Sequence, residues 1–176
     1  LRIWNGLDAE VLHPPPPPRD YRSEAYGDYI FFASRLAPLK RADLLLRALA
    51  EPAARGVRCV IGGDGEARVA LQQLARDLGV DSRVTFTGAL SEQALVDHYA
   101  RCRAVAFIPK REDYGFITAE AFASGKPVIT CSDSGGPLDL VTHRVTGVVV
   151  EPAPAAVALA MAELMADRAL AETWGR

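Results

Sequence analysis

Short apolar runs alternate along the chain with stretches of helical periodicity. Each run is rich in Val, Ile, Phe or Ala and is bounded by Gly, Ser, Asp or Pro, which is typical of strands buried in a sheet. The predicted strands cover residues 29–33, 57–62, 83–87, 103–108, 127–130 and 146–150.

Two of the intervening segments carry a clear apolar stripe. The segment from Leu71 to Leu78 has apolar residues at i, i+3, i+4 and i+7, and the segment from Val157 to Leu164 repeats this spacing. Strands that alternate with helices need right-handed crossovers between parallel neighbours, which cover both faces of the sheet. The sequence therefore predicts an α/β fold: a Rossmann-like, three-layer, doubly wound parallel sheet of about six strands.

The domain organisation follows from five consecutive prolines at 14–18, which fix an extended backbone and remove hydrogen-bond donors. We interpret residues 1–27 as a proline-rich connector between domains and residues 28–176 as one domain, a size that fits the total length of 176 residues. Because the chain begins with Leu rather than Met, we expect a fragment of a longer protein. Trp4 and Trp174 are expected either to pack against the remainder or to lie at the surface.

Composition and charge exclude several classes of function. Twenty Lys and Arg against 22 Asp and Glu leave a net charge of −2, which gives no general attraction for nucleic acid or an anionic membrane. No run of 18 apolar residues is present, so no membrane-spanning helix is predicted. Cys59, Cys102 and Cys131 are an odd number and form no C-x-x-C pair, so we expect neither a zinc site nor a disulfide framework, and a reducing, cytoplasmic setting.

The expected fold itself selects two loops for a ligand. In a doubly wound sheet of order 3-2-1-4-5-6, ligands bind where the carboxyl ends of strands 1 and 4 meet. The loops that follow those strands, 34–41 and 110–117, are densely charged. Arg35 and Lys40 supply cations, and a helix that begins near Gly115 directs free N–H groups into the same space, so we expect a phosphate or diphosphate there. The alternative, that both cations are simply solvated, stays open at this point.

Two acids accompany these cations. Glu112 precedes the helix that begins near Gly115, and Glu120 lies within its first turns. Carboxylates accept hydrogen bonds from hydroxyls, so the pair suits a ribose or a transferred sugar. An acid near a helix N-terminus also stabilises the helix itself, which is the structural alternative.

Other candidate motifs carry less information. The glycine-rich turn at 62–65 resembles part of a dinucleotide fingerprint, but the third glycine position holds Arg68 and the turn follows the second strand rather than the first. A nicotinamide or flavin oxidoreductase is therefore the weaker alternative. His98 shares a helical stripe with Tyr99 and Cys102, which favours a half-buried packing role over catalysis.

Six motifs in order carry a family resemblance that covers nearly the whole chain. They are W-N-G-L-D at 4–8, S-R-L-x-x-x-K-R at 34–41, I-G-G-D-G-E at 61–66, R-V-T-F-T-G-A-L-S at 83–91, E-D-Y-G-F-I-T-A-E-A-F-A-S-G-K-P-V at 112–128, and S-G-G-P at 134–137 with T-G-V-V-V at 146–150. With them, the chain from Asn5 to about Asp167 resembles the C-terminal, donor-binding domain of family 4 glycosyltransferases, group 1 enzymes of GT-B architecture.

The resemblance implies a binding site for the diphosphate of a nucleotide sugar. By this similarity, Arg35 and Lys40 hold the diphosphate, and the backbone N–H groups of Phe116 and Ile117, behind Gly115, complete the site. Cleavage of the sugar–diphosphate bond builds negative charge on the leaving group, so Arg35 and Lys40 are also expected to act in catalysis.

The resemblance also implies roles for the remaining site residues. Glu120 would bind the ribose hydroxyls, and Glu112 would contact the transferred sugar and belong to the catalytic set. The loop around Leu90 would border the base through backbone groups. The sequence departs from the family pattern at Ser34 and Arg41, where Gly is common, and at 113–114, where Gly-Phe is typical.

The activity implied is retaining transfer of a hexose-type sugar from a nucleoside-diphosphate sugar to an acceptor hydroxyl, in polysaccharide or glycolipid synthesis, without metal or other cofactor. The acceptor side is expected on an N-terminal Rossmann domain outside this sequence, with any contact to the inner face of a membrane made through that domain. The fragment alone should bind nucleotide but transfer little sugar. A non-catalytic nucleotide-binding or interaction module is the alternative, and the nucleotide of the donor stays open among UDP, GDP, ADP and others.

Overall fold

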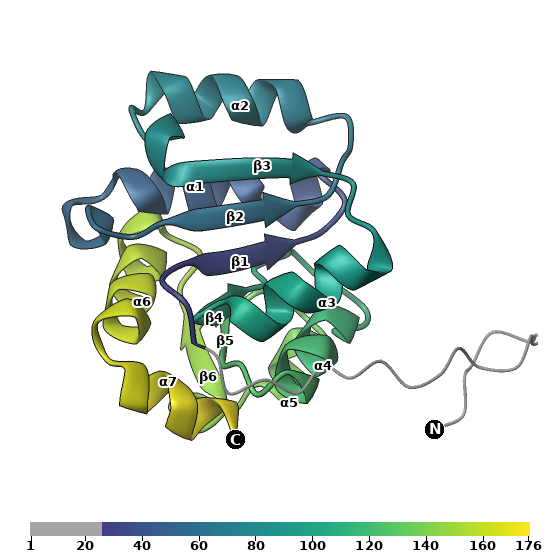
Figure 1. Ribbon diagram of the computed structural model, residues 1–176, viewed down its shortest axis with the longest axis vertical. Coiled ribbons are helices and arrows are strands. Elements are labelled where there is room, and N and C mark those ends of the chain that lie inside the picture. The colour runs from purple at the N-terminus through teal and green to yellow at the C-terminus, as the bar shows by residue number, and fades with distance from the viewer. Residues whose placement is uncertain (1–25) are drawn as a thin grey trace, which may run out of the picture.

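One parallel sheet of six strands organises the chain (Figure 1). The computed structural model describes residues 26–176. The strands are β1 (Ile30–Ala33), β2 (Cys59–Gly62), β3 (Val84–Gly88), β4 (Ala104–Ala106), β5 (Val128–Cys131) and β6 (Gly147–Val150). Their order in the sheet is β3-β2-β1-β4-β5-β6. Both the predicted strands and the predicted doubly wound order are confirmed.

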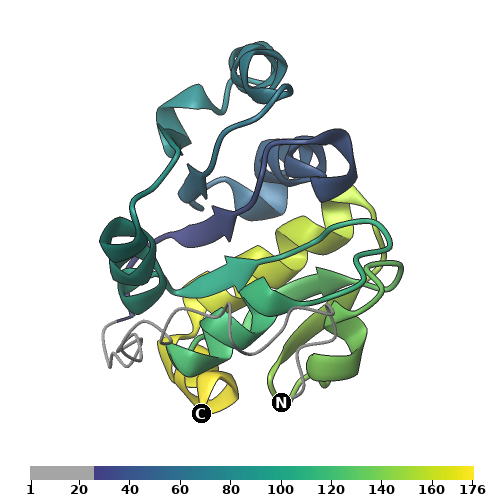
Figure 2. The same cartoon turned by 90° about the vertical axis from the view of Figure 1, so that its right-hand side faces the viewer.

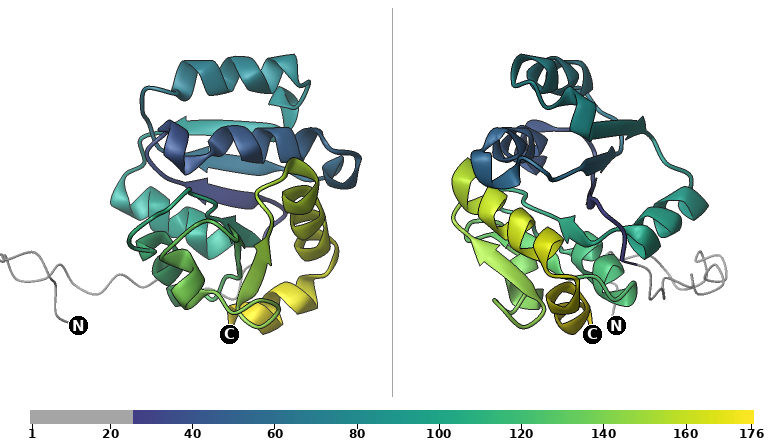
Figure 3. Two further views of the ribbon diagram at one scale, coloured as in Figure 1. Left: turned by 180° about the vertical axis from the view of Figure 1, so that it is seen from behind. Right: turned by 60° about the vertical axis from the view of Figure 1, so that its left-hand side comes forward.

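Helices cover both faces of this sheet (Figure 3). They are α1 (Ala42–Ala50), α2 (Arg68–Asp77), α3 (Glu92–Arg101), α4 (Phe116–Ala123), α5 (Pro137–Leu140), α6 (Pro154–Ala166) and α7 (Arg168–Gly175), with 3-10 turns η1 (Pro38–Lys40), η2 (Pro52–Ala54) and η3 (Asp81–Arg83). Residues of α1, α2, α6 and α7 share one apolar cluster, and those of α3 and α4 share the other with Val141, which directly follows α5. The sheet and the helices on its two faces form three layers, which confirms the predicted Rossmann-like sandwich.

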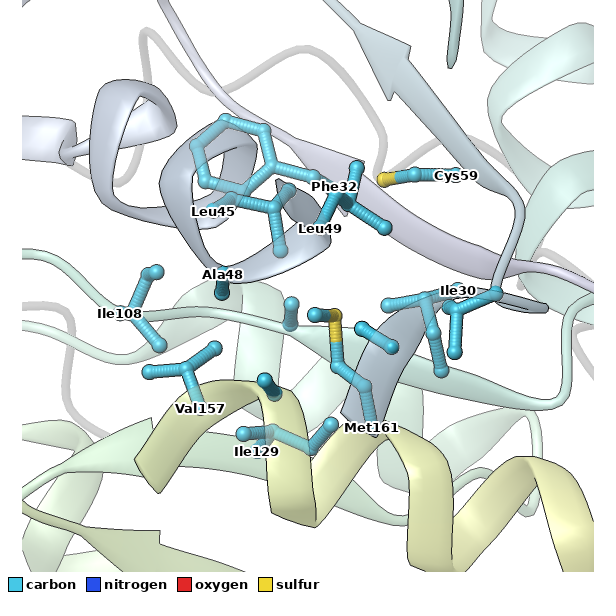
Figure 4. Packing of buried hydrophobic residues seen from close by; sticks show 14 of the residues in the cluster. Ile30, Phe32, Leu45, Ala48, Leu49, Cys59, Ile108, Ile129, Val157 and Met161 are labelled. Atoms are coloured by element: carbon cyan, nitrogen blue, oxygen red, sulfur yellow. The ribbon is translucent and has the colours of Figure 1, made fainter. Parts of the chain in front are cut away.

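Strand β1 shows why the sequence forms this sandwich. All four of its residues are buried, and they alternate between the two clusters: Ile30 and Phe32 on one side, Phe31 and Ala33 on the other. Because both faces of a parallel strand covered by helices are buried, its sequence is a continuous apolar run. Figure 4 shows the first side, where Phe32 lies beside side chains of α1 in a cluster to which α6 also contributes.

Two expectations about particular residues have different outcomes. His98 is half-buried in α3 and stacks on Phe31 with ring centroids 5.1 Å apart, so its predicted packing role is confirmed. The expectation for Trp174 is wrong, because its side chain is 6% exposed and belongs to the core through α7. An apolar helical face that continues past Asp167 explains this burial. Trp4 and nearly all of the predicted connector at 1–27 lie outside the described residues.

The topology places the ends of β1 and β4 side by side. These strands pair with each other, and β1 pairs with β2 on its other side while β4 pairs with β5, so the winding direction reverses between them. The loops that follow both strands therefore lie along the carboxyl edge of the sheet, which Figure 2 views. Within residues 26–176, no helix has the length and apolar character needed to cross a bilayer.

Candidate functional site

The charged loops after β1 and β4 meet at the carboxyl edge of the sheet. The ammonium group of Lys40, at the end of η1, contacts the carboxylate of Glu112, which lies in the loop between β4 and α4. The two side chains are 26% and 23% exposed. The prediction that segments about 70 residues apart face each other at the switch point is therefore confirmed by a direct ion pair.

Arg41 holds the loop that carries Lys40. Its backbone is left-handed, with φ 58°, and its side chain is 14% exposed. That group donates to the carbonyl oxygens of Ile108 at 2.7 Å and Pro109 at 2.6 Å, and to both carboxylate oxygens of Asp133 at 2.9 and 2.7 Å. Arg41 thus connects the loops after β1, β4 and β5, and its hydrogen bonds lower the pKa of Asp133 below its usual value.

The backbone of Glu112 is fixed by the glycine turn after β5. The N–H of Glu112 donates to the carbonyl of Ser134 at 2.8 Å, and the N–H of Gly136 donates to the carbonyl of Glu112 at 2.6 Å. A Cβ at Gly135 would lie 2.6 Å from the carbonyl oxygen of Glu112 and would need φ +79°. The S-G-G-P motif therefore supports the acidic loop, because only glycine fits the close approach and the positive φ at position 135.

The glycine turn at 62–65 supports the other loop in the same way. A Cβ at Gly63, whose φ is +121°, would lie 1.9 Å from the carbonyl oxygen of Ser34, and one at Gly65 would lie 2.5 Å from that of Leu36. The N–H of Leu36 donates to the carbonyl of Asp64 at 2.9 Å. These glycines allow the loop after β2 to pack against the loop after β1, which positions Arg35.

Helix α4 begins at the same edge. Its N-cap is Gly115, and its first residues are Phe116 and Ile117. The first N–H groups of a helix have no partner within it and lie at the positive end of its dipole, so they bind anions. The Phe116 ring is 69% exposed and stacks on Tyr114 at 5.7 Å, so this residue offers its backbone while its side chain faces solvent.

A cavity of about 410 Å³ lies beside these loops. It contains four of the predicted site residues, Arg35, Leu90, Ile117 and Glu120. The cavity also includes residues that sequence reasoning did not assign to a site: Ala33, Ser34, Gly63, Asp64, Ala89, Leu95 and Tyr99. Lys40 and Glu112 do not line this cavity, so the predicted site residues divide between the cavity and the loops that carry the ion pair.

The predicted cations have acidic partners. Arg35, with a side chain 75% exposed, lies 3.3 Å from the carboxylate of Glu66, and Lys40 contacts Glu112. Their exposure differs threefold, so Arg35 is the more hydrated of the two. Glu120 is half-buried and accepts a hydrogen bond from the hydroxyl of Tyr99 at 2.9 Å.

Two contacts were missed by sequence reasoning. Tyr99 was assigned only to a packing stripe, and Arg41 was noted only as a departure from glycine. The signal for Arg41 was present, since a large cationic residue at a left-handed position needs side-chain contacts to stabilise it. Within the part of the chain that the structure describes, no group of His, Cys, Asp and Glu is arranged to hold a metal ion.

Comparison with known proteins identifies the family of this chain. A family profile described as "Glycosyl transferases group 1" matches residues 19–176. The GDP-mannose-dependent alpha-(1-6)-phosphatidylinositol monomannoside mannosyltransferase of Mycobacterium tuberculosis (strain ATCC 25618 / H37Rv) is 36% identical over 184 residues, which cover 97% of this chain and 48% of that protein. The D-inositol 3-phosphate glycosyltransferase of Mycolicibacterium smegmatis is 34% identical over 159 residues, covering 85% and 36%.

The fold is shared with solved glycosyltransferase structures. The crystal structure of Anabaena HepE in complex with UDP and glucose has a TM-score of 0.75 and 27% identity, and the match covers 85% of this chain and 41% of that one. The chain spans about half the length, or less, of these proteins. From the profile match and the similarity to these relatives, we conclude that this chain belongs to the group 1 glycosyl transferase family.

Proposed function

We propose that this chain is the donor-binding half of a retaining, family 4 glycosyltransferase. It binds a nucleoside-diphosphate sugar and serves the transfer of a hexose-type sugar to an acceptor hydroxyl, in polysaccharide or glycolipid synthesis. The observation that carries the proposal is the meeting of Lys40 and Glu112 at the switch point of the sheet. A mannosyltransferase relative and the UDP and glucose complex of HepE support the choice of donor.

The diphosphate is assigned to the loops after β1 and β4. Arg35 and Lys40 provide two cations, and the first N–H groups of α4, from Phe116 and Ile117, provide the donors of a helix N-terminus. Departure of the diphosphate builds negative charge on its oxygens while the anomeric carbon becomes positive. Groups held in place before the reaction stabilise that charge as it develops, which lowers the barrier.

Glu112 serves the transferred sugar in this proposal. Its carboxylate can accept hydrogen bonds from sugar hydroxyls. The ion pair with Lys40 keeps this carboxylate beside the cation that holds the diphosphate, so the sugar and its leaving group are bound on adjacent side chains. Transfer proceeds at the front face, with the acceptor hydroxyl attacking beside the departing diphosphate, which gives retention of configuration.

The cavity receives the nucleoside. Glu120 accepts hydrogen bonds from the ribose hydroxyls, and the backbone around Leu90 borders the base. The acceptor-binding site and the general base that deprotonates the acceptor hydroxyl belong to an N-terminal Rossmann domain, in agreement with the share of each relative's length that this chain spans. We place the enzyme in the cytoplasm, at the inner face of the membrane if that domain binds lipid, and expect donor binding without a metal.

The test starts with calorimetric titration of UDP, GDP and ADP into the protein. Arg35→Ala, Lys40→Ala and Glu120→Ala should each weaken binding of the preferred nucleotide. Arg58→Ala is the control, because its exposed side chain pairs with Asp28 at the opposite edge of the sheet. Affinity that is unchanged in all three site variants would remove the site assignment.

Turnover is then measured on the full-length protein with sugar nucleotides, with and without EDTA. Sugar transfer that retains the anomeric configuration and survives EDTA is expected. Nucleotide binding without any transfer would instead identify a non-catalytic nucleotide-binding module. Inversion of configuration would contradict the retaining assignment alone.

A further inference from the structure

Helix α3 brings a buried tyrosine to the carboxylate assigned to the ribose. Tyr99 has no exposed surface, and its hydroxyl donates to Oε2 of Glu120 at 2.9 Å. The two residues are 21 positions apart and come from different helices, α3 and α4. Both belong to the wall of the 410 Å³ cavity. Because Tyr99 is covered, its hydroxyl can influence a ligand through Glu120.

The position of the Tyr99 ring is fixed by the core. The ring packs edge-to-face against Phe31 of β1, with centroids 5.2 Å apart and an angle of 85° between the planes. Phe31 has no exposed surface and in turn stacks on His98. Rings packed in this way have little rotational freedom, so the Tyr99 hydroxyl has a defined location in the fold.

The hydrogen bond from a fixed hydroxyl orients the carboxylate. Glu120 is half-buried and its side chain has three rotatable bonds, so an unrestrained carboxylate would lose conformational freedom when a ligand binds. An ionised carboxylate accepts about four hydrogen bonds over two oxygens. The bond from Tyr99 uses one of these, and the remaining capacity is enough for two adjacent ribose hydroxyls.

We propose that Tyr99 is a positioning residue that orients Glu120 for the 2′- and 3′-hydroxyls of the donor ribose. The inference rests on the proposed function, because it assigns Glu120 to the ribose. It goes further, because it assigns the discrimination between ribose and deoxyribose to Tyr99, a residue that does not itself contact the donor. A residue that served only to attach α3 to α4 would have no such effect.

The experiment compares Tyr99→Phe with a matched variant, Tyr29→Phe. The Tyr29 hydroxyl donates to the backbone carbonyl of His98 in the same helix at 3.1 Å, and Tyr29 does not contribute to the cavity. Each variant thus deletes one hydroxyl that is hydrogen-bonded to α3 or α4, but only Tyr99→Phe removes a bond to Glu120. The probes are UDP, GDP and ADP with their 2′-deoxy and 3′-deoxy counterparts, titrated by calorimetry.

The measured quantity is the ratio of affinities for the ribonucleotide and its deoxy counterpart, with the base that the unmodified protein binds most tightly. Tyr99→Phe should lower this ratio about threefold to tenfold, the range of an ordinary intramolecular hydrogen bond, because Tyr99 acts on the ribose indirectly. Affinity for the deoxy nucleotide should stay within about twofold, because diphosphate and base contacts are untouched. Tyr29→Phe should leave the ratio unchanged.

Two further variants keep the test decisive. Glu120→Gln should lower the ratio as Tyr99→Phe does, and Tyr99→Phe should add little in the Glu120→Gln background. If Tyr99→Phe melts near the assay temperature, all titrations are repeated below its melting temperature, with the unmodified protein and Tyr29→Phe measured at the same temperature. An unchanged ratio for folded Tyr99→Phe would overturn the inference.

The possible failures are distinguishable. If the unmodified protein binds none of the three nucleoside diphosphates, the proposed function and this inference both fall. If it binds and Glu120→Gln lowers the ratio while Tyr99→Phe does not, only the inference is overturned. Equal weakening of ribo and deoxy nucleotides by Tyr99→Phe also overturns it, because such a loss shows a purely structural role.

Discussion

Replacement of Arg41 tests whether its guanidinium holds the loops of the site together. Arg41→Ala removes the bonds to two carbonyl groups and the bidentate bond to Asp133 while keeping a Cβ at the left-handed position. Arg41→Gly removes the same bonds and also relieves the backbone strain. The pair therefore separates the contribution of the side chain from that of the backbone.

The expected loss in the free energy of unfolding depends on how deeply Arg41 and Asp133 are buried. Breaking a fully buried ion pair destabilises by about 3 to 5 kcal/mol. The Arg41 side chain is 14% exposed but that of Asp133 is 36% exposed, so water can solvate the Asp133 carboxylate once its partner is removed. We therefore expect Arg41→Ala to lower the free energy of unfolding by about 2 to 3 kcal/mol. Glycine at a left-handed position should recover about 1 kcal/mol of this loss.

Arg144 is the matched control, because it also has a left-handed backbone, with φ 60°, but a side chain that is 58% exposed. Its ion pair with Glu163 at 3.0 Å lies at the surface, so Arg144→Ala should cost about 1 kcal/mol or less. The increase in the free energy of unfolding from the alanine to the glycine variant should be about the same at positions 41 and 144.

The assay is urea unfolding, with the free energy of unfolding extrapolated to water. Nucleotide affinity is measured on the same variants, and Arg41→Ala should weaken it because Lys40 precedes Arg41 in the η1 turn. Equal stability of Arg41→Ala and Arg144→Ala would show that the buried guanidinium bonds of Arg41 contribute nothing beyond a surface ion pair, contrary to this prediction.

Three further predictions concern pH, backbone and thiols. Hydrogen bonds from Arg41 lower the pKa of Asp133 in the folded protein, so the ion pair should stabilise the fold fully above the unfolded pKa near 4 and lose that contribution as the pH falls through the folded pKa. In urea unfolding from about pH 6 to pH 3, the free energy of unfolding should therefore decline less steeply for Asp133→Asn than for the unmodified protein. Gly63→Ala should destabilise by about 3 kcal/mol, because the added Cβ meets the carbonyl of Ser34, whereas Gly79→Ala, with φ +66° and open space, should cost about 1 kcal/mol in the same assay. Burial raises the pKa of the Cys131 thiol to about 11, so iodoacetamide at pH 8 should modify it only in unfolded protein, and rapid native labelling would contradict this.

The sheet could be predicted from the sequence because its signals are local. Each apolar run is long enough to identify a buried strand, and the alternation with helices restricts the order of strands to very few topologies. The ends of strands are less well defined. Residues 103–108 were predicted as a strand, but regular β4 covers only Ala104–Ala106, although the N–H of Phe107 still donates to the carbonyl of Ile129 at 2.9 Å.

The candidate site could be located but not assembled from sequence. Topology alone predicts that the loops bearing Lys40 and Glu112 meet, because the strands that precede them are neighbours. Which side chains pair within the site depends on helix rotation and rotamers that no local pattern encodes. The bond from Tyr99 to Glu120 requires α3 and α4 to present one residue each to the same space, so periodicity could assign Tyr99 only to the buried face of its helix.

The affinity of the protein for a nucleoside diphosphate, relative to the matching nucleoside, tests most directly whether Lys40 belongs to a diphosphate site. Calorimetry with UDP and uridine, and with GDP and guanosine, gives this ratio for the unmodified protein, Lys40→Met and the distant control Arg58→Met. Lys40→Met should weaken diphosphate binding about tenfold or more and leave nucleoside binding within about twofold, since it removes one charge-assisted contact. Equal loss for diphosphate and nucleoside, or no loss for either, would contradict the account.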